Sequence, residues 1–115
     1  MESSTPRWLA TAVTGLSAAA CFAIASHVAA AEKPVAHTVI IEGVAYQPDA
    51  LKVKRGDTVI WINKDPFPHT VTAAGAFDSK DIAAGASWKY VARRAGSHSY
   101  ICTLHPNMKG TLTIE

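Results

Sequence analysis

The residues that could do chemistry lie near the end of the chain, in the segment 100–110. Cys102, His105 and Met108 follow one another at intervals of three, and each side chain can bind a metal ion. A loop that joins two adjacent strands can fold this spacing around one point. A fourth ligand must come from elsewhere, and His69, at the start of a short strand-like run, is the candidate. The predicted site therefore contains one thiolate, two imidazoles and one thioether.

This donor set narrows the choice of metal. Thiolate and thioether ligands favour copper, especially Cu(I), while imidazole suits both of its oxidation states. Structural zinc sites prefer paired cysteines and rarely recruit methionine. Four protein ligands leave no open position for a substrate, and no Ser/His/Asp set or carboxylate pair stands out by its spacing. The pattern predicts one copper ion, one-electron transfer and no enzymatic activity.

Each of these residues has a simpler interpretation when it is taken alone. A lone cysteine at a strand end, such as Cys102, is more often a small buried apolar residue. Met108 could pack in the core, and His105 could be an ordinary surface residue beside Pro106. Their grouping in one loop, with a histidine upstream, favours the metal site.

The elements that must position this loop are predicted to be strands. In several short segments apolar and polar residues alternate, or β-branched and aromatic residues dominate. These segments are 37–42, 51–54, 58–62, 69–72, 88–93, 97–102 and 111–114. Residues 73–86, with Gly75, Gly85 and six alanines, are interpreted as a loop with one helical turn. So many short strands without a βαβ period predict an all-β sandwich or a small barrel.

The N-terminal segment predicts export. Residues 8–31 contain no Asp, Glu, Lys or Arg, Arg7 precedes them, and Ala29-Ala30-Ala31 offers a small-residue cleavage site. We interpret residues 1–31 as a signal peptide and residues 32–115 as a single domain in the periplasm. The alternatives are an uncleaved anchor that tethers the domain to the membrane, and lipid attachment at Cys21.

Cysteine content and charge limit the function further. The predicted domain has a single cysteine, Cys102, so it cannot form an internal disulfide. A lone thiol in an oxidising compartment is a liability unless a metal occupies it. The formal net charge is +2, without a basic run beyond Arg93-Arg94, so nucleic-acid binding is not predicted. No long apolar edge or heptad seam appears, and a monomer is expected.

The segment 100–110, with its Cys-x-x-His-x-x-Met spacing, resembles the cupredoxin (blue-copper) family and, within it, the amicyanins. The upstream segment 56–63, followed by Pro68-His69, is similar to the same family. The resemblance covers residues 37–115 and implies a Greek-key β-sandwich (cupredoxin-like) with one type 1 copper ion near one end. It also implies the roles of four ligands, with three equatorial and one axial: His69, Cys102 and His105, and then Met108.

Three positions depart from the pattern of this family. Thr70 stands where the family has an asparagine that ties the two ligand loops together. Leu104 replaces a proline and restores a backbone N–H that can donate toward the sulfur of Cys102, which predicts a shifted reduction potential. Asn107 replaces an aromatic residue on the surface that the family uses for docking, so the partner of this chain need not be the usual one.

The leading hypothesis is a one-electron carrier between redox protein partners, whose donor and acceptor the sequence does not identify. His105 would be the exit point, with Pro106 and Phe67 as its apolar surroundings. One alternative is a periplasmic copper carrier or storage protein, although such proteins tend to use open, exchangeable Met/His sites. Another is a structural or adhesion β-sandwich that has kept the ligands without using them.

Overall fold

The computed structural model describes residues 3–4, 12, 14–24 and 32–115. The chain divides into two units, Met1–Ala30 and Ala31–Glu115. The described residues of the first unit form no helix or strand. The described part of the chain contains no helix that is long and apolar enough to span a membrane. Much of the predicted signal peptide, its cleavage site included, lies outside the described residues.

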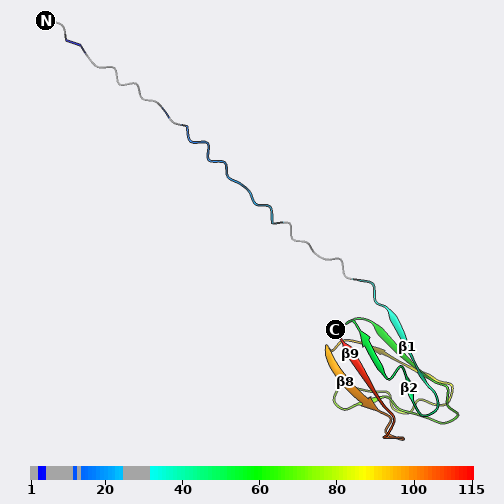
Figure 1. The fold of residues 1–115 in the computed structure, drawn as a ribbon. Coiled ribbons are helices and arrows are strands. Elements are labelled where there is room, and N and C mark those ends of the chain that lie inside the picture. Colours follow the sequence, from blue (N-terminus) through cyan, green and yellow to red (C-terminus); the bar gives the residue numbers. More distant parts are fainter. Residues whose placement is uncertain (1–2, 5–11, 13, 25–31) are drawn as a thin grey trace. The chain divides into compact units, whose positions relative to one another are not determined.

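The second unit is a two-sheet sandwich (Figure 1). Its strands are β1 (Ala36–Ile41), β2 (Tyr46–Gln47), β3 (Ala50–Val53), β4 (Thr58–Asn63), β5 (Thr72–Ala73), β6 (Phe77–Asp78), β7 (Ser87–Val91), β8 (Gly96–Ile101) and β9 (Lys109–Ile114). One sheet has the order β2-β1-β4-β7 and the other has the order β3-β9-β8-β5-β6. Strands distant in sequence pair with each other, as in a Greek-key sandwich. The predicted all-β sandwich is confirmed.

Strand β4 shows how the sequence pattern builds the core. Its residues alternate between half-buried and buried positions, so that Val59 and Trp61 are fully buried. The indole Nε1 of Trp61 donates to the hydroxyl of Tyr100 in the other sheet at 3.3 Å, and the two rings meet edge to face. This contact joins the two sheets. It also fixes β8 one residue before the strand ends.

The pairing of β8 with β9 depends on one glycine. Tyr100 lies opposite Gly110 in the antiparallel register, and a Cβ at position 110 would lie 2.3 Å from Cζ of the Tyr100 ring. No other residue fits there unless the ring moves. Gly110 thus lets the two strands that flank residues 102–108 pair closely.

The structure differs from the prediction in its shortest elements. The strands β2 and β6, of two residues each, were not predicted. The segment 73–86, expected to be a loop with one helical turn, instead contains β6 and a bridge between Ile82 and His69. No helical turn forms in this segment. Its backbone instead makes two tight turns, closed by Ala76 N to Ala73 O at 2.9 Å and Ala86 N to Ala83 O at 3.0 Å, and pairs as strand on either side of the first turn.

Candidate metal centre

The predicted ligand loop, residues 102–108, connects β8 to β9, which Figure 1 shows side by side. Three backbone hydrogen bonds close the loop: Cys102 N to Met108 O at 3.1 Å, His105 N to Cys102 O at 3.2 Å, and Met108 N to His105 O at 2.9 Å. Each bond joins two of the three residues that the sequence singled out. The interval of three residues therefore corresponds to a compact turn.

His69 reaches the same region from the segment after β4. Its backbone bridges to Ile82, with His69 N donating to Ile82 O at 3.1 Å and Ile82 N donating to His69 O at 2.7 Å. The buried side-chain amide of Asn63 donates to Phe67 O at 2.9 Å and to Ile82 O at 3.0 Å. These bonds hold the segment before His69, whose side chain is fully buried.

Three predicted ligands bring their donor atoms together. His69 Nδ1 and His105 Nδ1 lie 3.6 Å and 3.8 Å from Cys102 Sγ, and all three atoms lie within 4.8 Å of one another. Metal–sulfur bonds of about 2.3 Å and metal–nitrogen bonds of about 2.0 Å, at about 110–120°, place the two atoms about 3.5–3.8 Å apart. The observed separations therefore fit a single ion bound by all three side chains.

The fourth predicted ligand, Met108, lies at the end of the same loop. It is 3% exposed, and its main chain makes two of the bonds that close the loop. Its burial fits a thioether ligand as well as core packing, so the axial role of Met108 stays a prediction.

Asp65 is a site residue that the sequence analysis missed. Its Oδ2 lies 2.7 Å from His69 Nε2, and its carboxylate also accepts from Val44 N at 2.9 Å and Gly43 N at 2.7 Å. Burial raises the pKa of Asp65, but these hydrogen bonds outweigh burial and hold the pKa below its usual value. Because an ionised Asp65 can only accept, Nε2 of His69 carries the ring proton and donates it to this carboxylate. The lone pair of His69 is then on Nδ1, which faces Cys102. The available signal was an acidic residue four positions before a candidate ligand.

The thiol of Cys102 is fully buried and accepts a hydrogen bond from Thr70 N at 3.3 Å. This backbone donor comes from Thr70 and not from Leu104, the donor suggested by the sequence. The carbonyl of Thr70 in turn accepts from the hydroxyl of Tyr46 at 2.5 Å. Burial raises the pKa of Tyr46, with the charges of Cys102 and Tyr100 adding to the effect, so this hydroxyl stays protonated and keeps donating. The backbone of Thr70 is therefore held through both its N–H and its carbonyl.

The two ligand segments are also tied by a side chain. Thr103 N donates to Thr70 Oγ1 at 2.8 Å, which joins the residue after the thiol to the residue after His69. Thr70 thus makes the connection that the family usually makes through asparagine. The shorter side chain still reaches because the two segments lie close together here.

The site meets solvent at His105, which is half-buried. The ring of Phe67 lies 5.1 Å from the ring of His69 and 5.6 Å from that of His105, centroid to centroid. Phe67 and Leu104 are 38% and 47% exposed. The site therefore has a buried interior and an apolar rim at the surface.

Known proteins resemble this chain in both sequence and structure. The family model for a cupredoxin-like domain matches residues 14–114. Amicyanin from Paracoccus versutus is 33% identical over 95 residues, which cover 76% of this chain and 72% of that protein. Amicyanin-alpha from Methylorubrum extorquens is 30% identical over 113 residues, 92% of this chain and 95% of that protein.

Solved structures agree with the sequence comparison. An oxidized amicyanin variant superposes with a TM-score of 0.66 at 31% identity, over 70% of this chain and 82% of that chain. The Cu(I) form of another amicyanin variant superposes with a TM-score of 0.66 at 28% identity, over 76% of this chain and 87% of that chain. The family model spans most of the chain, and the sandwich and its clustered donors agree with that match. The chain belongs to the cupredoxin-like family.

Proposed function

We propose that this protein is an exported type 1 (blue) copper protein that carries one electron at a time between redox protein partners. Membership of a family that includes amicyanin supports a carrier and not an enzyme. The observation that carries the proposal is the meeting of His69 Nδ1, Cys102 Sγ and His105 Nδ1 within 4.8 Å. Two imidazoles and one thiolate in one plane, with a weak thioether, form the donor set of copper electron-transfer sites.

The proposed ligands are His69, Cys102 and His105 in the equatorial positions and Met108 in the axial position. When bound, copper supplies a single redox step between Cu(II) and Cu(I). The protein keeps its ligands in place during that step: Asp65 orients the ring of His69, and Thr70 N holds the sulfur of Cys102. His69 and Cys102 are both fully buried, which excludes water from the site. The half-buried ring of His105 is the proposed point of electron entry and exit.

Export rests on the N-terminal composition and on the cysteine content. We propose that residues 1–31 are removed and that residues 32–115 act in the periplasm, as a monomer. Cys102, the single thiol of that domain, would then be occupied by the metal. To test this, the full chain is expressed in a bacterium and the product is fractionated and weighed by mass spectrometry. A periplasmic product that begins at Glu32 supports the proposal; an intact chain in the membrane fraction indicates a tethered protein.

A periplasmic copper carrier or storage protein is the alternative from the sequence, and the geometry favours it less. Its metal would have to leave and enter readily, whereas His69 and Cys102 are fully buried and held by hydrogen bonds. Voltammetry and metal exchange on the copper-loaded full-length protein separate the two functions. We expect a reversible one-electron wave and slow loss of copper to a Cu(I) chelator. Rapid, complete transfer without a reversible wave would assign the protein to copper delivery.

A further inference from the structure

A row of hydroxyl groups runs from the ligand loop to a carboxylate on the surface. Thr103 Oγ1 lies 3.2 Å from Thr70 Oγ1, and Thr70 Oγ1 lies 3.0 Å from Thr72 Oγ1. Thr72 Oγ1 donates to Asp78 Oδ1 at 3.1 Å. We name these four side chains the threonine relay. It reaches the metal centre because Thr103 follows Cys102 directly and Thr70 follows His69.

The two ends of the threonine relay set the direction of every hydroxyl proton in it. An ionised Asp78 can only accept, so Thr72 gives its single proton to that carboxylate. In its bond with Thr70, Thr72 must then accept and Thr70 must donate. Since Thr70 has no second proton, its oxygen accepts from both the backbone N–H and the hydroxyl of Thr103. All hydroxyl protons therefore point toward Asp78.

Asp78 is held where it can play this part. It lies opposite Thr72 in the pairing of β5 with β6. Lys80 N donates to its Oδ1 at 2.9 Å, and Lys80 Nζ lies 3.1 Å from its Oδ2. The backbone N–H and then the side chain of Lys80 lower the pKa of Asp78, so the carboxylate is charged at neutral pH.

We propose that Asp78 is a positioning residue of the metal centre, which acts through Thr72 and Thr70 on the peptide that follows Cys102. Asp78 holds the hydroxyl of Thr72, and Thr72 in turn holds the hydroxyl of Thr70 where its oxygen accepts from Thr103 N–H. This holds the two ligand segments in register with each other. Water in place of Asp78 would hold Thr72 less firmly, because Asp78 is fixed opposite Thr72 by the strand pairing and by the N–H of Lys80. The role in tuning copper rests on the proposed function, but the role in ordering Thr103 N–H does not.

The test measures amide hydrogen exchange at Thr103 by NMR in the full-length protein without metal. Its variants are Asp78→Ala, Thr72→Val and the double variant, with Asp81→Asn as the matched control. Asp81 is an exposed acid in the same segment, and its change to Asn removes the same charge without altering the threonine relay. Thr103 N–H suits this measurement because its acceptor is the Thr70 hydroxyl itself. The amide of Leu112, in the core of β9, reports on global stability.

We expect Asp78→Ala and Thr72→Val each to speed exchange at Thr103 by roughly two- to tenfold, the effect of losing one hydrogen bond. The double variant should match Thr72→Val, because both changes interrupt the same relay. Asp81→Asn should leave Thr103 unchanged, and Leu112 should be unaffected throughout. Unchanged exchange at Thr103 in Asp78→Ala, or effects of the two changes that add, would overturn the proposal.

A second readout uses the copper-loaded full-length protein. Asp78→Ala and Thr72→Val should move the thiolate-to-copper absorption band and the reduction potential in the same direction, while Asp81→Asn should leave both as in the wild type. An equal shift of the potential in Asp81→Asn would instead mean a plain charge effect. If the wild type shows no such band, the proposed copper function fails, and exchange at Thr103 still decides whether the relay exists.

Discussion

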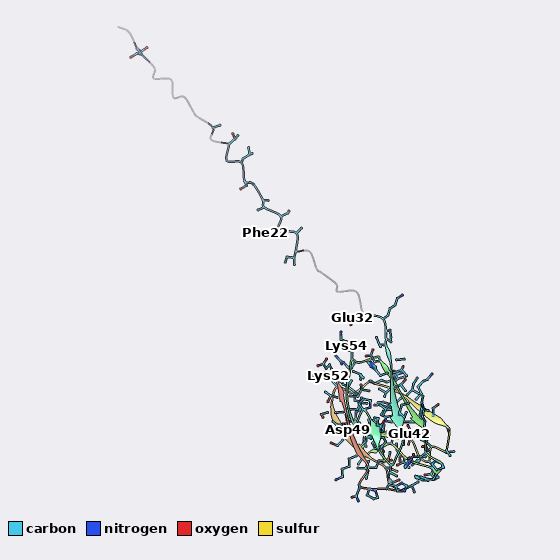
Figure 2. All side chains as sticks on the ribbon, turned by 45° about the vertical axis from the view of Figure 1, so that its right-hand side comes forward. Phe22, Glu32, Glu42, Asp49, Lys52 and Lys54 are labelled. Atoms are coloured by element: carbon cyan, nitrogen blue, oxygen red, sulfur yellow. The ribbon has the colours of Figure 1, made fainter. Side chains whose placement is uncertain are left out.

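Opposite ends of β1 and β4 each carry a histidine paired with an aspartate, and the two pairs differ in their surroundings. These strands are parallel, with Ala36 beside Thr58 at one end and Ile41 beside Asn63 at the other. At the first end, His37 Nε2 lies 3.0 Å from Asp57 Oδ2; past the second, His69 Nε2 lies 2.7 Å from Asp65 Oδ2. The first end also carries the charged side chains of Glu32, Lys52 and Lys54, which Figure 2 shows gathered there.

The two pairs differ in what surrounds the histidine on the side away from the aspartate. Nδ1 of His69 faces the sulfur of Cys102 in a fully buried site, while the side chain of His37 is 25% exposed. Within the described residues, the cluster of three potential ligands that could share an ion forms around His69. A carboxylate partner orients a histidine in both places. We propose that such a histidine becomes a metal ligand only where other donor atoms face its second nitrogen, as at His69, and that the pair of His37 and Asp57 contributes to stability instead.

Removal of each histidine should give the largest difference between the two ends. His69→Ala should lower the affinity for copper by more than about 100-fold, since even the residues that orient ligands contribute 10–100-fold. His37→Ala should leave the affinity unchanged within about twofold. Competition titration against a chelator of known affinity measures both variants. Equal losses would contradict the distinction drawn here between the two pairs.

The aspartates should differ in the same way with a smaller effect. Asp65→Ala removes the acceptor that orients His69 and should weaken copper binding by about 10–100-fold. Asp57→Ala is the matched change at the other end, and its copper affinity should equal that of the wild type. The same titration measures both variants, and a normal affinity in Asp65→Ala would show that the tautomer of His69 does not depend on this carboxylate.

Asp57 should instead govern stability in acid. The N–H of Val35, then the side chain of His37 and the N–H of Lys54, lower the pKa of Asp57 to about 2. The unfolded value is about 3.9, so ionised Asp57 stabilises the fold above about pH 4, and this contribution is lost as the pH falls toward 2. The difference in Tm between wild type and Asp57→Asn should therefore be large at pH 5 and shrink below pH 4. Other carboxylates titrate in both proteins and cancel. Parallel curves of Tm against pH for the two proteins would show that another group causes the acid sensitivity.

The smallest effect is expected from the exposed ion pair at the same end. Lys54 Nζ lies 2.5 Å from Glu32 Oε2, but the two side chains are 61% and 73% exposed. Water and salt screen such a pair strongly. Lys54→Ala should leave Tm unchanged within about 1 °C by thermal denaturation. A larger fall would mean that residues near Glu32 contribute to the fold of this end.

The sequence predicted the strands that carry a clear period and missed those without one. Thr58 to Asn63 alternates over a whole strand, and the structure buries every second residue. Tyr46–Gln47 and Phe77–Asp78 are too short to show a period, and they become strands only because a neighbouring strand pairs with them. Short strands of this kind depend on tertiary contacts that no local pattern reveals.

In the site, the ligands were predictable from the sequence, but the residues that position them were not. Cys102, His105 and Met108 share one loop, so their spacing alone placed them together, and His69 followed from the donor set and the family resemblance. Asp65 had only its spacing to His69 as a signal and Asp78 had none, because the sequence around an acidic residue does not show which side chain it will face. Asp78 meets Thr72 only through the pairing of β5 with β6. Residues that position the ligands can therefore be identified only once the structure is known.

The most direct test of the central claim is the visible absorption spectrum of the full-length protein after addition of Cu(II), measured for the wild type and for Cys102→Ser. We expect an intense blue band from thiolate-to-copper charge transfer in the wild type and none in the variant, in which oxygen replaces the sulfur. A wild-type protein that binds Cu(II) weakly or without this band, or a variant that keeps it, would contradict the assignment of a type 1 copper centre to His69, Cys102 and His105.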